Sequence, residues 1–217
     1  MRKIIIRVVI AAVILLVGIG VFQWHNYQQK VEYRKEALLY FKEEDYSKTI
    51  SYLGQALKLQ SVFAGKLDLD MTCYLAESHY QLKEYDEAEK IYDKLINNDS
   101  KNAQYYILKG ECLAKSGDAK AAVKVYEQGW NSTNDTDFLE KICEIYVEQK
   151  DYDNALKYIK GIEQGGESKA GFMYGKIVIY EKAQEYDRAY EAAKKYVELY
   201  PDDEAGKKEY IFLSTRI

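Results

Sequence analysis

The chain has one proline, two histidines and three cysteines in 217 residues, and no Cys-x-x-Cys pair occurs. The single proline, Pro201, excludes collagen-like and proline-rich classes, and cysteines without a pairing pattern exclude a small disulfide-stapled domain. The formal net charge is only -4, and the pI is near 5.4. Because sequence-independent nucleic-acid binding depends on Lys and Arg that neutralise phosphates, we expect no nucleic-acid partner.

Residue groups that carry out chemistry are also missing. His25 and His79 have no carboxylate or cysteine at metal-ligand spacing, and the sequence contains no GxSxG turn, Ser-His-Asp order or Gly-rich phosphate loop. Cys143 fits an inert packing residue, whereas Cys73 is the cysteine with the best claim to reactivity. We therefore predict that the protein is not an enzyme, holds no metal or cofactor, and has no small-molecule substrate.

What is present begins with an apolar run. Residues Ile4 to Phe22 contain one polar side chain, Arg7, and in a helix they span about 28 Å, close to the ~30 Å thickness of the bilayer hydrocarbon. Arg7 lies one turn inside the run, where its long stem can reach the headgroups. Trp24 and Tyr27 follow at the depth of an aromatic belt. The run therefore predicts membrane contact through residues 4–22.

Two membrane interpretations and one soluble one fit this run. A buried helix of a soluble protein is disfavoured, because nothing downstream looks suited to cover a helix that is apolar on every side. A signal peptide cleaved after Gly20 fits the basic start, but the run continues through Val21 and Phe22 without a polar segment. We predict an uncleaved signal-anchor at residues 1–24, a juxtamembrane linker at 25–30, and the rest of the chain on the extracytoplasmic side.

The remainder of the chain is periodic. Each of five short turns contains an acidic residue or lies beside one, and is followed by a small residue with apolar positions at helical spacing on both sides. The small residues are separated by 39, 34, 33 and 34 positions. They are Thr49, Ala88, Ala122, Ala155 and Ala189. The five extra residues of the first step fall near Ser61–Lys66, and they predict a longer helix or loop there.

The repeat resembles the tetratricopeptide repeat, whose pattern is Trp-x2-Leu-Gly-x2-Tyr followed by Ala-x3-Phe and Pro. The second unit matches as Thr72-x2-Leu75-Ala76-x2-His79 with Ala88-x3-Tyr92, and the third as Tyr106-x2-Lys109-Gly110-x2-Leu113 with Ala122-x3-Tyr126. The resemblance implies an all-α, right-handed superhelical α-solenoid of about five helix–turn–helix repeats. We expect units near 31–62, 69–101, 103–133, 136–166 and 170–201 (together 31–201), and a capping helix at 202–217.

The resemblance also implies a concave groove lined by the first helix of each unit. Glu77, Glu111 and Glu144 recur at one register position and, with Glu140 and Glu148, form an acidic strip that would favour a basic or neutral segment. An ordinary solvated helix face explains these glutamates as well. The candidate groove residues are Arg34, Cys73, Glu77, Ile107, Glu111, Glu140, Glu144, Glu148 and Tyr174.

Together these patterns predict a non-catalytic, membrane-tethered module that binds a peptide or protein partner in its groove, as a scaffold or accessory factor for complex assembly or export. The alternative is a secreted soluble binding module that is released by cleavage after Gly20.

Overall fold

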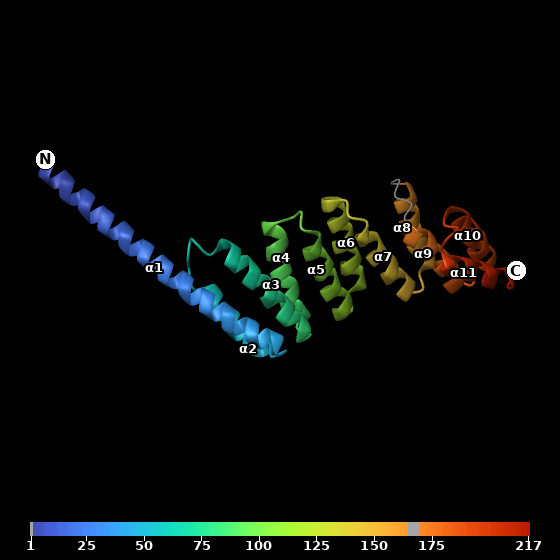
Figure 1. Ribbon diagram of the computed structural model, residues 1–217, viewed down its shortest axis with the longest axis horizontal. Helices are drawn as coiled ribbons and strands as arrows, with labels where there is room; N and C mark the ends of the chain where they lie inside the picture. Colours follow the sequence, from blue (N-terminus) through green and yellow to red (C-terminus); the bar gives the residue numbers. More distant parts are fainter. Residues whose placement is uncertain (1, 165–169) are drawn as a thin grey trace. The chain divides into compact units, whose positions relative to one another are not determined.

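The computed structural model describes residues 2–164 and 170–217, with the backbone alone at 161–164. These residues form eleven α-helices and no strand (Figure 1). The predicted all-α architecture of helical hairpins with a final single helix is confirmed. Residue 1 of the predicted anchor and residues 165–166 of the predicted fourth repeat lie outside the described part. The helices are α1 (Arg2–Lys42), α2 (Tyr46–Lys58), α3 (Gly65–Gln81), α4 (Tyr85–Asn98), α5 (Ala103–Ser116), α6 (Ala119–Thr133), α7 (Asp137–Glu148), α8 (Tyr152–Gln164), α9 (Ala170–Lys182), α10 (Tyr186–Leu199) and α11 (Glu204–Ser214).

The helices group into two compact units, Met1–Ser100 and Lys101–Ile217, each of which we describe by itself. In the first unit α1 pairs with α2 and α3 with α4, and α2 packs against α3. In the second unit α5 to α10 form three hairpins that pack in chain order, and α11 packs on α10. Within each unit, each helix therefore contacts its neighbours in the sequence, as expected for stacked repeats.

The turns inside the five hairpins share one backbone geometry. The first helix ends at a residue with positive φ, and the following acidic residue donates its amide to a carbonyl five residues back, which is the Schellman arrangement. Asp45 and Asp118 then accept a backbone amide of the next helix through their side chains, at 3.1 and 2.9 Å, so the acidic residue starts that helix. The positive-φ residues are Glu44, Lys83, Gly117, Lys150 and Gln184.

Small residues set the distance between the two helices of a hairpin. Ala37 and Ala76 are completely buried, and a β-carbon added to Gly110 would lie 2.1 Å from the ring of Tyr126 on the partner helix. Larger side chains at these positions would push the helix axes apart. A small residue also allows successive hairpins to pack closely, because Gly129 of α6 lies against the ring of Phe138 of α7.

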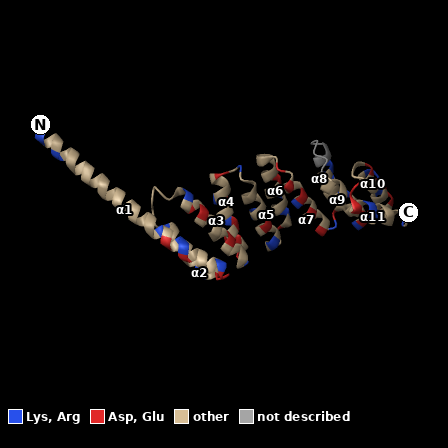
Figure 2. Cartoon of the chain, in the orientation of Figure 1, with Lys and Arg blue, Asp and Glu red and all other residues tan. Residues whose placement is uncertain are grey.

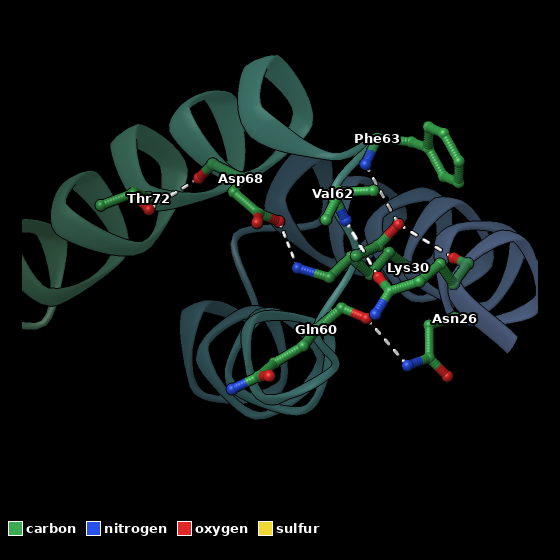
Figure 3. Close-up of polar contacts among 9 residues, drawn as sticks. Asn26, Lys30, Gln60, Val62, Phe63, Asp68 and Thr72 are labelled. Atoms are coloured by element: carbon green, nitrogen blue, oxygen red, sulfur yellow. Dashed lines mark hydrogen bonds and ion pairs between the residues drawn. The ribbon is translucent and has the colours of Figure 1, made fainter. Parts of the chain in front are cut away.

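Helix α1 differs from the sequence interpretation at its middle. Residues 25–30, which the sequence predicts as a juxtamembrane linker, lie inside one unbroken helix of 41 residues. Lys30 is 1% exposed and forms an ion pair with Asp68 of α3, and the Asn26 amide donates to the backbone carbonyl of Gln60 at 2.8 Å (Figure 3). The apolar start of the helix thus continues directly into the first hairpin.

The start of α1 is exposed along its whole length. Residues 4–19 have no buried side chain, and α1 is, among the described residues, the one helix long and apolar enough to cross a membrane. Figure 2 shows the same contrast in charge, with few charged residues on the N-terminal half of α1 and both signs mixed over α3 to α11. A signal sequence would pass the same test of length and composition.

Candidate functional site

A hollow of about 350 Å3 lies between α7 and α9 in the second unit, with one wall from α8. Its floor is apolar, and the carboxylates of Glu140 and Glu144 stand at its edge. The apolar lining residues are Val147 of α7, Ile159 of α8, and Phe172, Val178 and Ile179 of α9. The arrangement suits one or two apolar side chains next to a positively charged group.

Two glycines on α9 give the hollow its width. A β-carbon at Gly171 would have no atom within 4 Å, and one at Gly175 would meet only Ile159 Cδ1 at 3.8 Å. Both positions therefore have room for a side chain, and the hollow is open there because the two residues are glycines. On α7 the lining residues Glu140, Glu144 and Val147 follow at helical spacing, so they share one face of that helix.

Cys143 contributes to the lining as an unreactive group. Its Sγ donates to the carbonyl of Ala155 at 3.4 Å, and burial together with the nearby Glu140 and Glu144 raises the pKa of the thiol to about 12. The thiolate is the nucleophilic form of cysteine, and it is scarcely populated near neutral pH. The expectation that Cys143 is a packing residue agrees with this environment.

The glutamate strip is partly neutralised by a lysine that the sequence reasoning missed. Lys141 Nζ lies 3.3 Å from Glu111 of α5 and 3.7 Å from Glu144 of α7. Partial burial lowers the pKa of the Lys141 ammonium, but the two carboxylates outweigh this, so the pKa stands above its ordinary value. Glu111 is therefore engaged within the protein, whereas the Glu144 side chain is 67% exposed. The i,i+3 spacing of 141 and 144 was the available signal.

The other candidate residues of the second unit do not line this hollow. The Tyr174 ring packs edge-on against Tyr196, 5.6 Å between centroids, and so contributes to the core of α9 and α10. Ile107 is half-buried on α5, and Glu148 is exposed at the end of α7. The structure thus brings Glu140 and Glu144 together at the hollow, with Glu111 behind them through Lys141.

The three candidates of the first unit have local partners or are half-buried. Arg34 Nε donates to Asp70 Oδ2 at 2.6 Å, and Glu77 Oε1 accepts from Gln81 at 2.6 Å. Cys73 is half-buried on α3, one turn before Glu77. Within the residues that the structure describes, no three His, Cys, Asp or Glu side chains converge as metal ligands.

A larger hollow of about 500 Å3 lies along α1 and α2 in the first unit. Most of its lining residues carry polar side chains and four of the seven are exposed, so it offers less apolar contact than the hollow between α7 and α9. It is lined by His25, Gln28, Gln29, Glu32, Tyr33, Glu36 and Tyr52. His25 on this wall has no acidic or cysteine cluster that would make a metal site among the described residues.

Solved structures with similar folds include tetratricopeptide repeat proteins, and the sequence identities are low. The chain is similar to MamA protein (16% identity, TM-score 0.59, 79% of this chain and 91% of that chain). It is also similar to a tetratricopeptide repeat protein from Parabacteroides merdae (15%, 0.62, 86% and 72%). A third is YrrB, described as a tetratricopeptide repeat protein with an unusual peptide-binding site (18%, 0.52, 81% and 89%). These likenesses concern the fold.

A search of curated proteins finds no match to the chain. The family model described as "Tetratricopeptide repeat", in contrast, matches residues 37–215. This range covers both units from the small residue Ala37 of the first hairpin to the end of α11. The chain therefore belongs to the tetratricopeptide repeat family.

Proposed function

We propose that this protein is a membrane-tethered binding module that holds a peptide segment of a protein partner in the hollow between α7 and α9. Tetratricopeptide repeat proteins are in general non-catalytic modules for protein–protein interaction, and this part of the account follows from the family. The tether, the hollow as binding site and the role as scaffold or accessory factor in complex assembly or export are the proposal. The observation that carries it is the hollow itself, apolar at its floor and acidic at its edge.

The lining selects the chemistry of the peptide. Burying apolar side chains on the floor contributes about 25 cal/mol per Å2 of surface removed from water, so one or two aliphatic or aromatic residues would supply most of the affinity. Glu140 and Glu144 favour Lys or Arg beside those residues and repel acidic segments. The partner segment is therefore apolar and basic. The likeness to YrrB is consistent with a peptide as ligand.

The apolar part of α1 supports the tether. Its exposed residues would have to leave water, and a bilayer is the environment that accepts them without a protein cover. The helix runs without a break past Gly20 into the first hairpin, where Asn26 and Lys30 are held by α3 and the preceding segment. This continuity favours the uncleaved anchor over a secreted module. Mass spectrometry of the mature chain distinguishes the uncleaved anchor from the secreted module, since cleavage after Gly20 removes twenty residues.

The binding site is tested by closing the hollow. Gly171→Leu places a side chain into the open space, whereas Gly54→Leu adds the same side chain to α2, where a β-carbon also meets nothing within 4 Å. We would measure fluorescence anisotropy of a labelled peptide of alternating Leu and Lys with the full-length chain in nanodiscs. A peptide with Glu in place of Lys reports on charge.

The proposal predicts that the Leu/Lys peptide binds, that Gly171→Leu weakens it at least about tenfold, or 1.4 kcal/mol, and that Gly54→Leu leaves it unchanged. The Leu/Glu peptide should bind more weakly than the Leu/Lys peptide. Equal loss with both variants, or equal binding of both peptides to the native chain, contradicts the proposed site.

A further inference from the structure

The segment that joins α2 to α3 carries two large exposed apolar side chains next to the end of the apolar run. Val62 is 80% exposed and Phe63 is 54% exposed, although the segment is hydrogen-bonded to α1. This contrast, a well-bonded backbone that presents its apolar side chains to the outside, is unusual for a soluble loop. Figure 3 shows Val62 and Phe63 beside α1, the helix that also carries Asn26 and Lys30.

The hydrogen bonds fix where along α1 the segment lies. Ser61 Oγ donates to the backbone carbonyl of Gln23 at 2.9 Å, and the Val62 amide donates to Gln23 Oε1 at 3.0 Å. Gln23 follows Phe22, the last residue of the apolar run, directly in sequence. Since a helix rises about 1.5 Å per residue, Val62 lies within one turn of the point where α1 would leave the hydrocarbon.

Aromatic side chains also connect this segment to α1, directly after the end of the apolar run. The Phe63 ring meets the Trp24 ring edge-on at 6.2 Å between centroids, and Trp24 stacks on Tyr27 at 5.5 Å. Trp24 is itself 54% exposed. Aromatic side chains at the end of an apolar helix are typical of the membrane–water interface, where an apolar ring and its polar atoms are both satisfied.

Several backbone groups of the segment are hydrogen-bonded within the protein, as a loop at the membrane interface requires. Amides that leave bulk water need partners inside the protein. The Val62 amide has Gln23 Oε1, the Phe63 amide has Ser61 Oγ at 3.4 Å, and the Ala64 amide has the Ser61 carbonyl at 3.2 Å. The carbonyl of Gln60 accepts from Asn26. These four backbone groups therefore keep their hydrogen bonds when the segment lies among lipid headgroups.

The flanking charges fit a lipid surface. Lys58 and Lys66 bound the segment, both are exposed, and no acidic residue lies between them. Basic residues at a membrane surface are attracted by anionic headgroups, at about 1 kcal/mol each. An apolar centre between two lysines matches the layered chemistry of an interface, with acyl chains inside and phosphates outside.

We propose that the segment Leu59–Ala64 is a second membrane contact, in which Val62 and Phe63 enter the interfacial layer beside the end of the transmembrane part of α1. This inference rests on the proposed tether. Two contacts, the helix and the loop clamped to it, orient the first hairpin relative to the bilayer, whereas a helix alone leaves its tilt and rotation open.

The test measures depth at single positions in the full-length chain. A genetically encoded dansyl amino acid replaces Val62, and the protein is reconstituted in vesicles of phosphatidylcholine and phosphatidylglycerol. Some vesicles carry a nitroxide on the acyl chain near the ester group. Leu15, inside the apolar run, and Glu43, directly after the far end of α1, serve as reference positions, and both are exposed. Circular dichroism checks that each variant keeps its helix content.

The proposal predicts a blue-shifted emission at position 62 and quenching by the nitroxide at least as strong as that at position 15, which lies deeper in the hydrocarbon, with no quenching at position 43. Quenching at 15 with none at 62 overturns the loop contact and leaves the tether intact. No quenching at 15 or 62 overturns both. A dansyl group at Phe63 in place of Val62 repeats the measurement, and absence of quenching at both 62 and 63 decides against the inference even if one substitution disturbs the loop.

Discussion

The backbone of Gly110 in α5 lies directly against the ring of Tyr126 in α6, so that a β-carbon on Gly110 would lie 2.1 to 2.7 Å from three ring atoms. No side chain can be accepted there without moving either the ring or the helix. Tyr126 is 2% exposed and is packed by its neighbours on all sides. The close approach of the two helices in this hairpin therefore depends on one missing methyl group.

Gly110→Ala should destabilise the protein by about 1–2 kcal/mol, because overpacking at so short a contact costs about 2–3 kcal/mol and is only partly offset by a gain in helix propensity of about 1 kcal/mol. Gly54→Ala is the matched control, since its β-carbon meets nothing within 4 Å, and this variant should gain up to about 1 kcal/mol. Urea denaturation followed by circular dichroism measures both. A Gly110→Ala variant as stable as the native chain would show that the hairpin does not depend on this contact.

The shared turn geometry predicts that substitutions at two equivalent turn positions, Gly117 and Lys83, change the free energy of unfolding in opposite directions. Gly117 has φ of 96° and Lys83 has φ of 62°, and each directly precedes the acidic residue of its hairpin. Because a side chain in the left-handed region costs about 1 kcal/mol, Gly117→Ala should lower the free energy of unfolding by about 1 kcal/mol. Lys83→Gly should not lower it and should raise it by a few tenths of a kcal/mol or more. A loss of stability with Lys83→Gly would contradict the assigned turn.

The ion pair between Lys30 and Asp68 should respond unequally to removal of its two members. Lys30 is almost fully enclosed, whereas Asp68 is 36% exposed. Asp68→Ala leaves an ammonium without its carboxylate in a buried place and should cost about 3 kcal/mol or more. Lys30→Met keeps the volume, leaves a carboxylate that water can reach, and should cost less than about 1.5 kcal/mol. Thermal unfolding of the full-length chain in detergent measures both, and equal losses would contradict the burial assigned to Lys30.

The second unit should lose stability as the pH rises through neutrality. Burial raises the pKa of Glu181 on α9 to about 7, and the adjacent Glu209 of α11 adds to the effect while Arg216 opposes it. Because the folded-state pKa lies above the ordinary value of 4.5, the folded chain holds this proton more tightly than the unfolded chain. The contribution to stability is complete below about pH 4.5 and is lost as the pH rises through about 7.

We expect the loss from Glu181 to amount to about 1 kcal/mol, after a discount for the partial exposure of the site. Glu181→Gln should remove this component of the pH dependence between pH 5 and pH 8 and should stabilise the chain at pH 8. Glu191→Gln, an exposed position on α10, is the control and should leave the profile unchanged. A Glu181→Gln profile that overlays the native one would contradict the assigned pair.

The sequence was sufficient for the repeat architecture because its signal is local and recurs five times. The small residues Ala37, Ala76 and Gly110 and the acidic turns lie at similar offsets, and within each unit each helix contacts its chain neighbours. The left-handed residue before each acidic turn was not predictable from residue type, since four of the five are Glu, Lys or Gln, which rarely adopt it.

What the sequence could not supply depends on contacts between distant positions. Asn26 and Lys30 look like linker residues, and they are buried only because Gln60 and Asp68 lie against them, 34 and 38 residues away. Lys141 of α7 lies beside Glu111 of α5, and no spacing rule along one helix indicates this contact. The hollow between α7 and α9 is lined by Gly171 and Gly175 of α9, whose missing side chains leave space beside Ile159 of α8, whereas in the sequence they resemble ordinary breaks in a helix.

The most direct test of the proposed binding site is to locate a bound peptide on the native full-length chain. A Leu/Lys peptide with one benzophenone side chain is irradiated with the protein in nanodiscs, and the cross-linked residues are identified by mass spectrometry. The account predicts adducts on α7 and α9 at the lining of the hollow, around Val147 and Val178, and their loss with Gly171→Leu. Adducts spread over exposed positions such as Lys157 of α8, or adducts unchanged by Gly171→Leu, would contradict it.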